Sequence, residues 1–310
     1  MSAALVAVVL SLVLDHLAPS AQRLRQHDRV GALLGLGLTE AGQRPLLAAP
    51  WGWLLLLAAP LALLLMLQWL LGGWLYGLPG FLLQLAVLFL CWGPRDLDLD
   101  VEALASAQDR DSRAQALRAL SGGSIDRAET GTSLVHTVFR QGLQRWFGVL
   151  FWFLLLGAFG ALLYRLAQLA ARQRESAIEA QREPLQQFAA ALDYLPAQLM
   201  CLALALAAHF DAVLTAWRDW HAGRSQGESV LEIGFLDAAA RASVREDLAE
   251  EAADAGLPLP EHTEGIASAG GADIPDSALR ELRDAMSLVW RVLLVWLSVL
   301  ALFVLAGYVR

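Results

Sequence analysis

A group of polar side chains just ahead of a long apolar segment has the types and the spacing to bind an anion. The group consists of His136, Arg140, Gln144 and Arg145. An α-helix places positions 136, 140 and 144 on one side, because they are four residues apart. Arginine binds carboxylates and phosphates through paired hydrogen bonds. Together with Arg165, which follows the apolar segment, these residues predict a cationic cleft for an anionic ligand at the membrane surface.

Two other interpretations of these residues stay open. The arginines can instead lie among lipid headgroups as anchors, with His136 as an ordinary helix-surface residue. Asp193 is either a buried functional carboxylate, since an ionisable group within a membrane span is costly, or the end of an apolar segment at the interface. On the binding interpretation, the candidate ligand-binding residues are His136, Arg140, Gln141, Gln144, Arg145, Arg165, Asp193 and Tyr194.

The elements that must position these residues are apolar helices. No charged residue occurs between Arg44 and Arg95, which is long enough for two crossings of roughly 20 residues each. No β pattern is present, so the predicted fold class is an all-α, polytopic integral membrane protein with cytoplasmic helical loops, forming one domain over residues 1–310. The predicted spans are residues 2–14, 50–71, 76–93, 146–164, 185–210 and 288–309.

The arginines predict the orientation of these spans. If all six segments cross, the loops 15–44, 95–145 and 211–284 share one side and carry 17 arginines, against 5 on the other side. Positive charge marks the cytoplasmic side, so the three loops are predicted to be cytoplasmic and the protein to be a multi-pass protein of the bacterial inner membrane. Alternatively, Gly157 and Gly160 break segment 146–164 into a re-entrant pair of half-helices, which changes the number of crossings.

Composition excludes several functions. The net charge is −8, and residues 211–284 hold 16 acidic residues against 6 arginines, which argues against a nucleic-acid partner. All 23 basic residues are arginine, so a lysine nucleophile and a P-loop lysine are excluded. Cys91 and Cys201 lie in apolar runs and are interpreted as small buried hydrophobes. Neither a metal site nor a cofactor is predicted, because no Cys/His spacing fits zinc.

The polar loops predict further helices. Residues 97–120 read as one or two surface helices, and Phe235–Ala255 reads as an amphipathic helix with its acids on the exposed side. Residues 256–277 are rich in Gly, Pro and Ala and read as a flexible linker. His209 and His221 flank the Trp217–Trp220 patch, which is interpreted as an interfacial aromatic belt and not as a metal site.

Several short motifs resemble the AmpE family. They are Leu150-Phe151-Trp152 to Gly157, Asp193-Tyr194-Leu195-Pro196-Ala197-Gln198-Leu199, Trp217-Arg218-Asp219 and Leu288-Val289-Trp290. AmpE is a membrane protein encoded beside the AmpD amidase in bacteria with inducible β-lactamase. It is similar in turn to the CobD/CbiB family, membrane enzymes that attach an aminopropanol phosphate to adenosylcobyric acid. The resemblance extends from the first span to the last.

The sequence departs from the cobalamin enzymes where their acids lie. A family run resembling E-T-V-A-E-N-T-V-D-G reads H-T-V-F-R-Q-G-L-Q-R at 136–145, without an acid. A second run, resembling Y-K-A-V-N-T-L-D-S-M, has Ala171 in place of its aspartate. Divalent cations bind carboxylate oxygens, so these changes remove the groups that would hold a metal-bound nucleotide. No catalytic residue is therefore assigned, and a cobinamide synthase is not expected.

The resemblance implies a regulatory role. The leading hypothesis is a non-enzymatic inner-membrane protein of a signalling pathway linked to cell-wall recycling and β-lactamase induction. Its ligand would be an anionic small molecule such as a muropeptide or nucleotide. The protein would lie in the lipid bilayer, and its protein partner is unknown. Binding would alter the position of the acidic segment 211–284. The alternatives are an enzyme with transferase or amide-forming activity on a phosphorylated substrate, and a structural membrane partner without a ligand.

Overall fold

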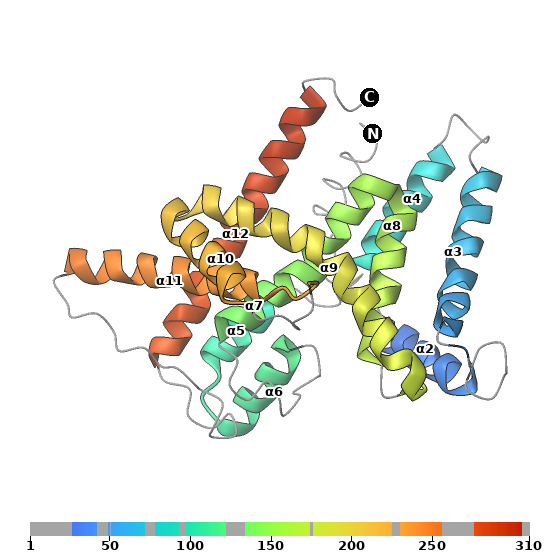
Figure 1. Ribbon diagram of the computed structural model, residues 1–310, viewed down its shortest axis with the longest axis horizontal. Helices are drawn as coiled ribbons and strands as arrows, with labels where there is room; N and C mark the ends of the chain where they lie inside the picture. The colour runs from blue at the N-terminus through green and yellow to red at the C-terminus, as the bar shows by residue number, and fades with distance from the viewer. Residues whose placement is uncertain are drawn as a thin grey trace. The chain divides into compact units, whose positions relative to one another are not determined.

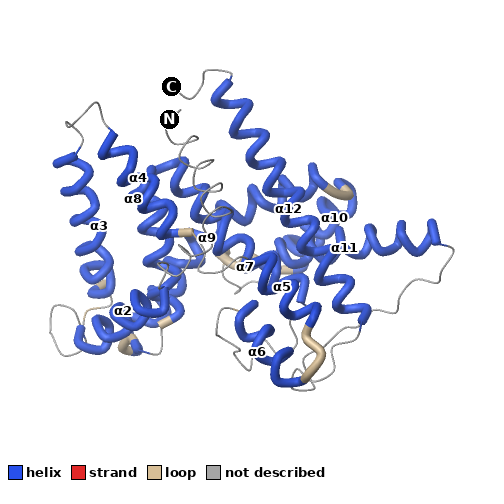
Figure 2. Tube along the Cα trace, turned by 180° about the vertical axis from the view of Figure 1, so that it is seen from behind, coloured by secondary structure: helices blue, strands red, loops and turns tan. Residues whose placement is uncertain are grey.

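The computed structural model describes residues 27–41, 49, 51–71, 78–92, 97–121, 134–173, 176–224, 230–255 and 276–305. Over these residues the regular elements are helices, without a strand, as Figure 1 and Figure 2 show. The predicted all-α fold is therefore confirmed. The predicted span 2–14 and residues 256–275 of the predicted linker lie outside the described residues.

The chain divides into two compact units. The first comprises Met1–Pro94, Gln144–Asp193 and Leu300–Arg310, and the second comprises Arg95–Leu143 and Tyr194–Val299. The first unit contains α2 (His27–Ala41), α3 (Gly52–Leu71), α4 (Leu78–Cys91) and α8 (Gly148–Arg172). The second contains α5 (Leu97–Ser106), α6 (Arg110–Leu120), α7 (Leu134–Gly142), α10 (Phe210–Gly223) and α11 (Gly234–Ala255). Three further elements, η4 (Leu143–Phe147), α9 (Glu179–Ala207) and α12 (Asp276–Leu305), contribute residues to both.

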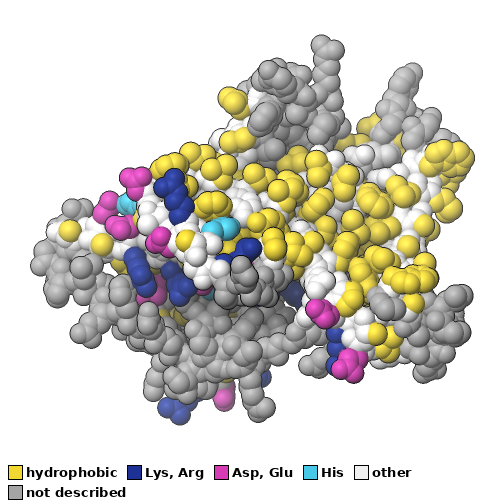
Figure 3. Space-filling view, in the orientation of Figure 1, with side chains coloured by type: hydrophobic (Ala, Val, Ile, Leu, Met, Phe, Trp, Pro, Cys, Tyr) yellow, Lys and Arg dark blue, Asp and Glu magenta, His cyan; other side chains and the backbone are white. Residues whose placement is uncertain are grey.

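Three helices are long and apolar enough to cross a membrane, by length and composition, among the described residues. They are Gly52–Leu71, Leu134–Arg172 and Glu179–Ala207, of which the second is interrupted at Gly157. Side chains such as Leu63, Met66 and Trp69 of α3 are exposed, as lipid-facing side chains of a span would be. Hydrophobic side chains also gather over the right-hand part of Figure 3, where α3 lies in Figure 1. These features indicate a membrane protein.

The core of the first unit joins α2, α3, α8 and the start of α9. Its buried members are Leu34, Leu38, Trp53, Leu57, Leu61, Leu166, Leu169, Ala170, Ala177 and Leu185. The rings of Trp53 and Phe188 contact each other at 5.1 Å between centroids, which holds α9 against α3. This packing covers the side of the second half of α8 that carries Leu166, Leu169 and Ala170.

The helix α8 is broken at Gly157. Its backbone has φ 67° and ψ −154°, a conformation that is essentially restricted to glycine. A Cβ atom at Gly160 would lie 2.2 Å from the carbonyl oxygen of Trp152, although eight residues of straight helix span roughly 12 Å. The chain therefore turns back on itself, and residues 148–156 and 158–172 form a helical hairpin. The reversal agrees with the alternative in which segment 146–164 is broken into two half-helices, and the non-helical residue is Gly157.

The second unit is built around α11. Both α7 and α10 pack against α11, and α5 packs against α6. Phe235 at the start of α11 is fully buried and makes ring contacts with Tyr194, Trp220 and His221. The 97–120 segment forms two helices, and the amphipathic helix predicted for 235–255 is present. Cys91 and Cys201, one in each unit, are both free and buried, as predicted.

Candidate functional site

The polar residues 136–145 do not lie on one regular helix. The helix α7 ends at Gly142, and residues 143–147 form a π-helical turn, which is wider than an α-helical turn. This turn changes the register, so positions 136, 140 and 144 do not follow a single α-helical face. Gln144 and Arg145 are buried within the first unit, whereas Arg140 is exposed within the second.

His136 faces an acidic residue of the second unit. Its Nδ1 lies 3.4 Å from Oδ1 of Asp237 on α11, and Arg241 contacts the other oxygen of the same carboxylate at 2.9 Å. The side chains of His136 and Asp237 are about one fifth exposed. The neighbouring Gln141 is buried in this unit. His136 therefore has a carboxylate within ion-pair distance.

The second half of α8 carries a row of polar side chains within the first unit. Tyr164, Gln168 and Arg172 are spaced by four residues, and Arg165 lies beside Tyr164, so all four share one side of the half-helix. Tyr164, Arg165 and Gln168 are almost completely buried, whereas Arg172 is exposed. We call Tyr164, Arg165, Gln168 and Arg172 the polar row. It extends from the interior of the unit to its surface.

Asp193 on α9 lies against the polar row. Its Oδ1 accepts hydrogen bonds from the Tyr164 hydroxyl at 2.6 Å and from the Gln168 amide at 2.8 Å. Asp193 is 5 % exposed, so its carboxylate is buried by protein atoms. The helix is held nearby by Trp152, whose indole nitrogen donates to the Leu192 carbonyl at 3.0 Å. Burial of an ionisable group is costly, and the two hydrogen bonds from Tyr164 and Gln168 offset part of that cost.

Arg165 is the least compensated charge of the row. Its guanidinium is 4 % exposed and donates through Nε and one terminal nitrogen to the carbonyl oxygen of Cys91, with an Nε–O distance of 2.7 Å. Over the described residues, no carboxylate lies within ion-pair distance of Arg165. A carbonyl satisfies hydrogen bonds but carries no full charge, and a buried cation without a counter-ion is costly.

Other cations surround Arg165. Arg145 and Arg172 both lie close enough for their charges to repel that of Arg165. Arg172 donates to the side-chain oxygen of Gln144 at 3.2 Å, so the second half of α8 contacts the π-helical turn. Gln144, Arg145, Arg165 and Arg172 therefore form a cationic group within one unit, with one amide side chain that can donate further hydrogen bonds. We call these four residues the arginine group.

Two candidate residues that are adjacent in sequence have different surroundings. Asp193 belongs to the first unit, whereas Tyr194 belongs to the second and packs edge-on against Phe235 at 6.0 Å between ring centroids. Trp217, Trp220 and His221 lie in the same aromatic group around Phe235. The surroundings of Tyr194 are therefore those of a packing residue.

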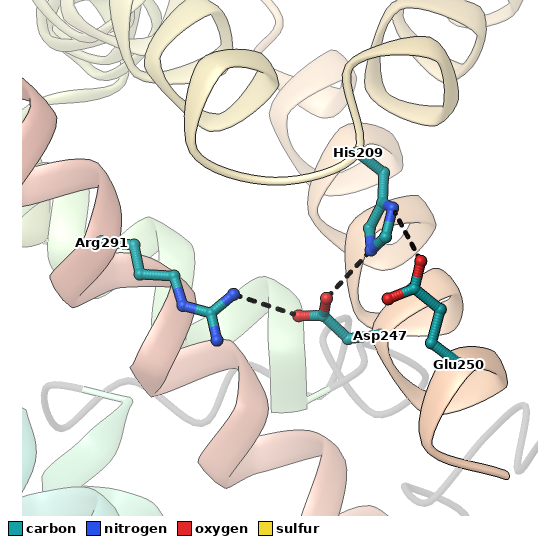
Figure 4. Close-up of polar contacts among 4 residues, drawn as sticks. All are labelled: His209, Asp247, Glu250 and Arg291. Atoms are coloured by element: carbon teal, nitrogen blue, oxygen red, sulfur yellow. Dashed lines mark hydrogen bonds and ion pairs between the residues drawn. The ribbon is translucent and has the colours of Figure 1, made fainter. Parts of the chain in front are cut away.

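A second charged group lies in the second unit, in Figure 4. His209, just ahead of α10, directs Nε2 to Asp247 at 3.0 Å and Nδ1 to Glu250 at 3.7 Å. Arg291 of α12 reaches the other oxygen of Asp247 at 3.9 Å. The Asp247 contact is a hydrogen bond, whereas Glu250 at 3.7 Å makes a charge contact without one. This arrangement suits an ionic clasp for α11 and not a general base.

The sequence interpretation missed part of the arginine group and its neighbours. Tyr164, Gln168 and Arg172 were not selected, although their spacing of four residues beside Arg165 was visible. The helical hairpin brings them next to Gln144 and Arg145, because it turns the chain back towards the start of α8. His136, Arg140 and Gln141 lie in the other unit, so the candidate residues are distributed over both.

Comparison with known proteins identifies relatives. The family described as "Regulatory signalling modulator protein AmpE" matches residues 51–232. A protein described as "Cobalamin biosynthesis protein CobD", from Chromobacterium violaceum, is 31 % identical over 230 residues, which cover 68 % of this chain and 70 % of the relative. No solved structure matches the chain. The helical hairpin and the arginine group lie within both the family match and the first unit.

Proposed function

Because the chain belongs to the family of regulatory signalling modulator protein AmpE, we propose that it is a multi-pass inner-membrane regulator that responds to an anionic small molecule. The ligand binds to the arginine group, with Arg172 at the surface and Arg165 in the interior. A muropeptide or a nucleotide has the required negative charge. The pathway is the one linked to cell-wall recycling and β-lactamase induction.

The observation that supports this proposal is the buried guanidinium of Arg165, whose partner is a backbone carbonyl. A buried cation of this kind is stabilised when an anion binds beside it. The two further arginines raise the local positive potential. Their charges repel that of Arg165, and a bound anion would relieve this repulsion. The exposed Arg172 gives this potential access to solvent.

The test is a binding measurement with the full-length protein in nanodiscs of neutral lipid. Calorimetric titration with adenosine diphosphate and with muramyl dipeptide compares the natural protein with Arg165→Gln, which removes the charge but keeps a donor for the Cys91 carbonyl. We expect the affinity for the anion that binds to fall about tenfold or more, because a charge-assisted hydrogen bond is lost. Arg110→Gln, at an exposed arginine of α6, is the control and should leave the affinity unchanged.

If neither compound binds, or if Arg165→Gln binds as tightly as the natural protein, the arginine group is not the site of these ligands. Retained folding of the variant is checked by circular dichroism and by its elution in size exclusion. A loss of affinity in Arg110→Gln of the same size would indicate a general effect of charge.

An enzyme of the CobD type is the second candidate, and the 31 % identical relative favours it. Against it, residues 136–145 hold no acid, and position 171 is an alanine. Magnesium prefers carboxylate and phosphate oxygens, so a metal-bound nucleotide would lack its usual protein ligands there. The test is turnover: purified protein that consumes no nucleotide in the presence of magnesium argues against the enzyme.

A further inference from the structure

A charge of the same sign as the proposed ligand lies beside the arginine group. Asp193 is buried, and its Oδ1 accepts hydrogen bonds from Tyr164 and Gln168, both neutral donors. The hydroxyl of Tyr164 lies within the electrostatic range of Asp193 and also of Arg165 and Arg172. In the ionised state, the carboxylate therefore offsets part of the positive potential that an anionic ligand would use.

The side chains near Asp193 determine how far its charge offsets that of the arginines. The second half of α8 presents Tyr164, Arg165, Gln168 and Arg172, and the π-helical turn contributes Arg145 through its effect on Arg165. The first half of α8 presents the neutral Trp152, whose indole nitrogen donates to the carbonyl of Leu192, the residue before Asp193. Arg165 and Arg172 lie on the same side of the second half of α8 as Tyr164 and Gln168, the two donors to Asp193.

We propose that the ionised Asp193 carboxylate limits anion binding to the arginine group, and that protonation of Asp193 relieves this limit. The inference rests on the proposed function and assigns a form of regulation to the same site. Ligand binding is accompanied by uptake of one proton from solvent, which forms an O–H bond on the carboxylate and changes no bond of the ligand. By linkage, the proton and the anion favour each other's binding to the same degree.

The first experiment needs no variant. Full-length protein in neutral-lipid nanodiscs is titrated with sulfate, whose charge stays constant from mildly alkaline to mildly acidic buffer. We expect the affinity for sulfate to rise about tenfold as the buffer is acidified, because a repulsion between two nearby charges is removed. Calorimetry in two buffers of different ionisation enthalpy should show net proton uptake on binding. A sulfate affinity that is independent of pH, or binding without proton uptake, would overturn the inference.

The second experiment identifies the group that takes up the proton. Asp193→Asn removes the charge and keeps a side-chain oxygen for the two donors, so it should bind sulfate about tenfold more tightly than the natural protein in alkaline buffer. It should also take up fewer protons on binding. Tyr164→Phe removes one of the same hydrogen bonds without removing the charge, and should not raise the affinity. If both variants raise it equally, loosened packing is the cause and the inference is wrong.

The results separate this inference from the proposed function. If sulfate fails to bind the natural protein at any pH, and Arg165→Gln behaves in the same way, the anion site itself is wrong. If sulfate binds and Arg165→Gln weakens it, but Asp193→Asn has no effect, the site is retained and the role of Asp193 is wrong. Repeating the titration in nanodiscs that contain phosphatidic acid tests whether a lipid headgroup competes for the same arginines.

Discussion

Gly148 lies directly against the phenol ring of Tyr164. A Cβ atom at position 148 would be 2.2 Å from Cζ and 2.3 Å from the hydroxyl oxygen of Tyr164. In a straight helix these two residues would be roughly 24 Å apart. Their contact therefore requires the reversal at Gly157, and it places the Tyr164 hydroxyl where it donates to Asp193.

Replacement of Gly148 by alanine should destabilise the protein. The added methyl group overlaps a rigid, fully buried ring, and overpacking of this kind costs about 1–3 kcal/mol. Thermal unfolding in detergent measures the effect. Gly37→Ala is the control, because its added atom meets the flexible end of Leu56 at 2.8 Å and should be tolerated better. Equal unfolding temperatures for the two variants would contradict the hairpin packing.

Replacement of Gly157 by alanine should destabilise the protein through the backbone alone. Among the described residues beyond its own stretch of helix, none has an atom within 4 Å of a Cβ added there, but the backbone conformation is one that other residues avoid, at about 1–3 kcal/mol. Gly80→Ala is matched, since its surroundings are also open and its φ is ordinary. That control should be neutral or slightly stabilising. A neutral Gly157→Ala would show that α8 is not broken at this residue.

The N-terminus of α6 should lose stability in acid. Asp109 caps this helix: its carboxylate accepts hydrogen bonds from the Ser112 hydroxyl at 2.5 Å and the Ser112 backbone N–H at 3.0 Å. These bonds lower the pKa of Asp109 below its ordinary value. A lowered folded-state pKa means that the stabilisation is present above the unfolded-state pKa and is lost as the pH falls through the folded-state value.

Carbon-detected NMR of the Asp109 carboxyl group measures this pKa in the folded protein. Asp109→Asn, which keeps the cap without the charge, should remove this contribution to the pH dependence. An Asp109 carboxyl group that titrates at its ordinary value would contradict the capping geometry.

Replacement of Asp247 by asparagine should loosen α11. Asp247 contacts His209 and Arg291 at once, and the loss of these partly exposed ion pairs should cost about 1 kcal/mol. Faster amide hydrogen exchange in α11 reports the loosening. Glu246→Gln removes the adjacent, exposed acid and serves as the control. If exchange is the same in both variants, the clasp does not hold the helix.

Much of the fold could be predicted from composition and periodicity. The uncharged run before Arg95 predicted α3 and α4, and the amphipathic pattern after Phe235 predicted α11. Both signals arise from short-range spacing of apolar residues, which hydrophobic burial enforces. Glycine likewise indicated the break in α8, because its backbone freedom is a local property.

The site was harder to predict because it depends on long-range contacts. The contact between Gln144 and Arg172 exists only because the hairpin closes, and the partner of Arg165 is a carbonyl at the end of α4. Every residue carries a backbone carbonyl, so a partner of this kind cannot be identified from residue types. The acids predicted on the exposed side of α11 were only partly placed correctly, since Asp237 and Asp247 are half-buried in ion pairs with histidines.

The π-helical turn at Leu143–Phe147 has a consequence for how this protein can change over generations. Such a turn holds one residue more than the helix around it, so loss of a single codon there would restore regular winding. Everything before the turn would then rotate by about 100° relative to everything after it. A deletion at Leu143 or Trp146 would thus change the helical register between Arg140 and the residues after the turn without removing Gln144 or Arg145.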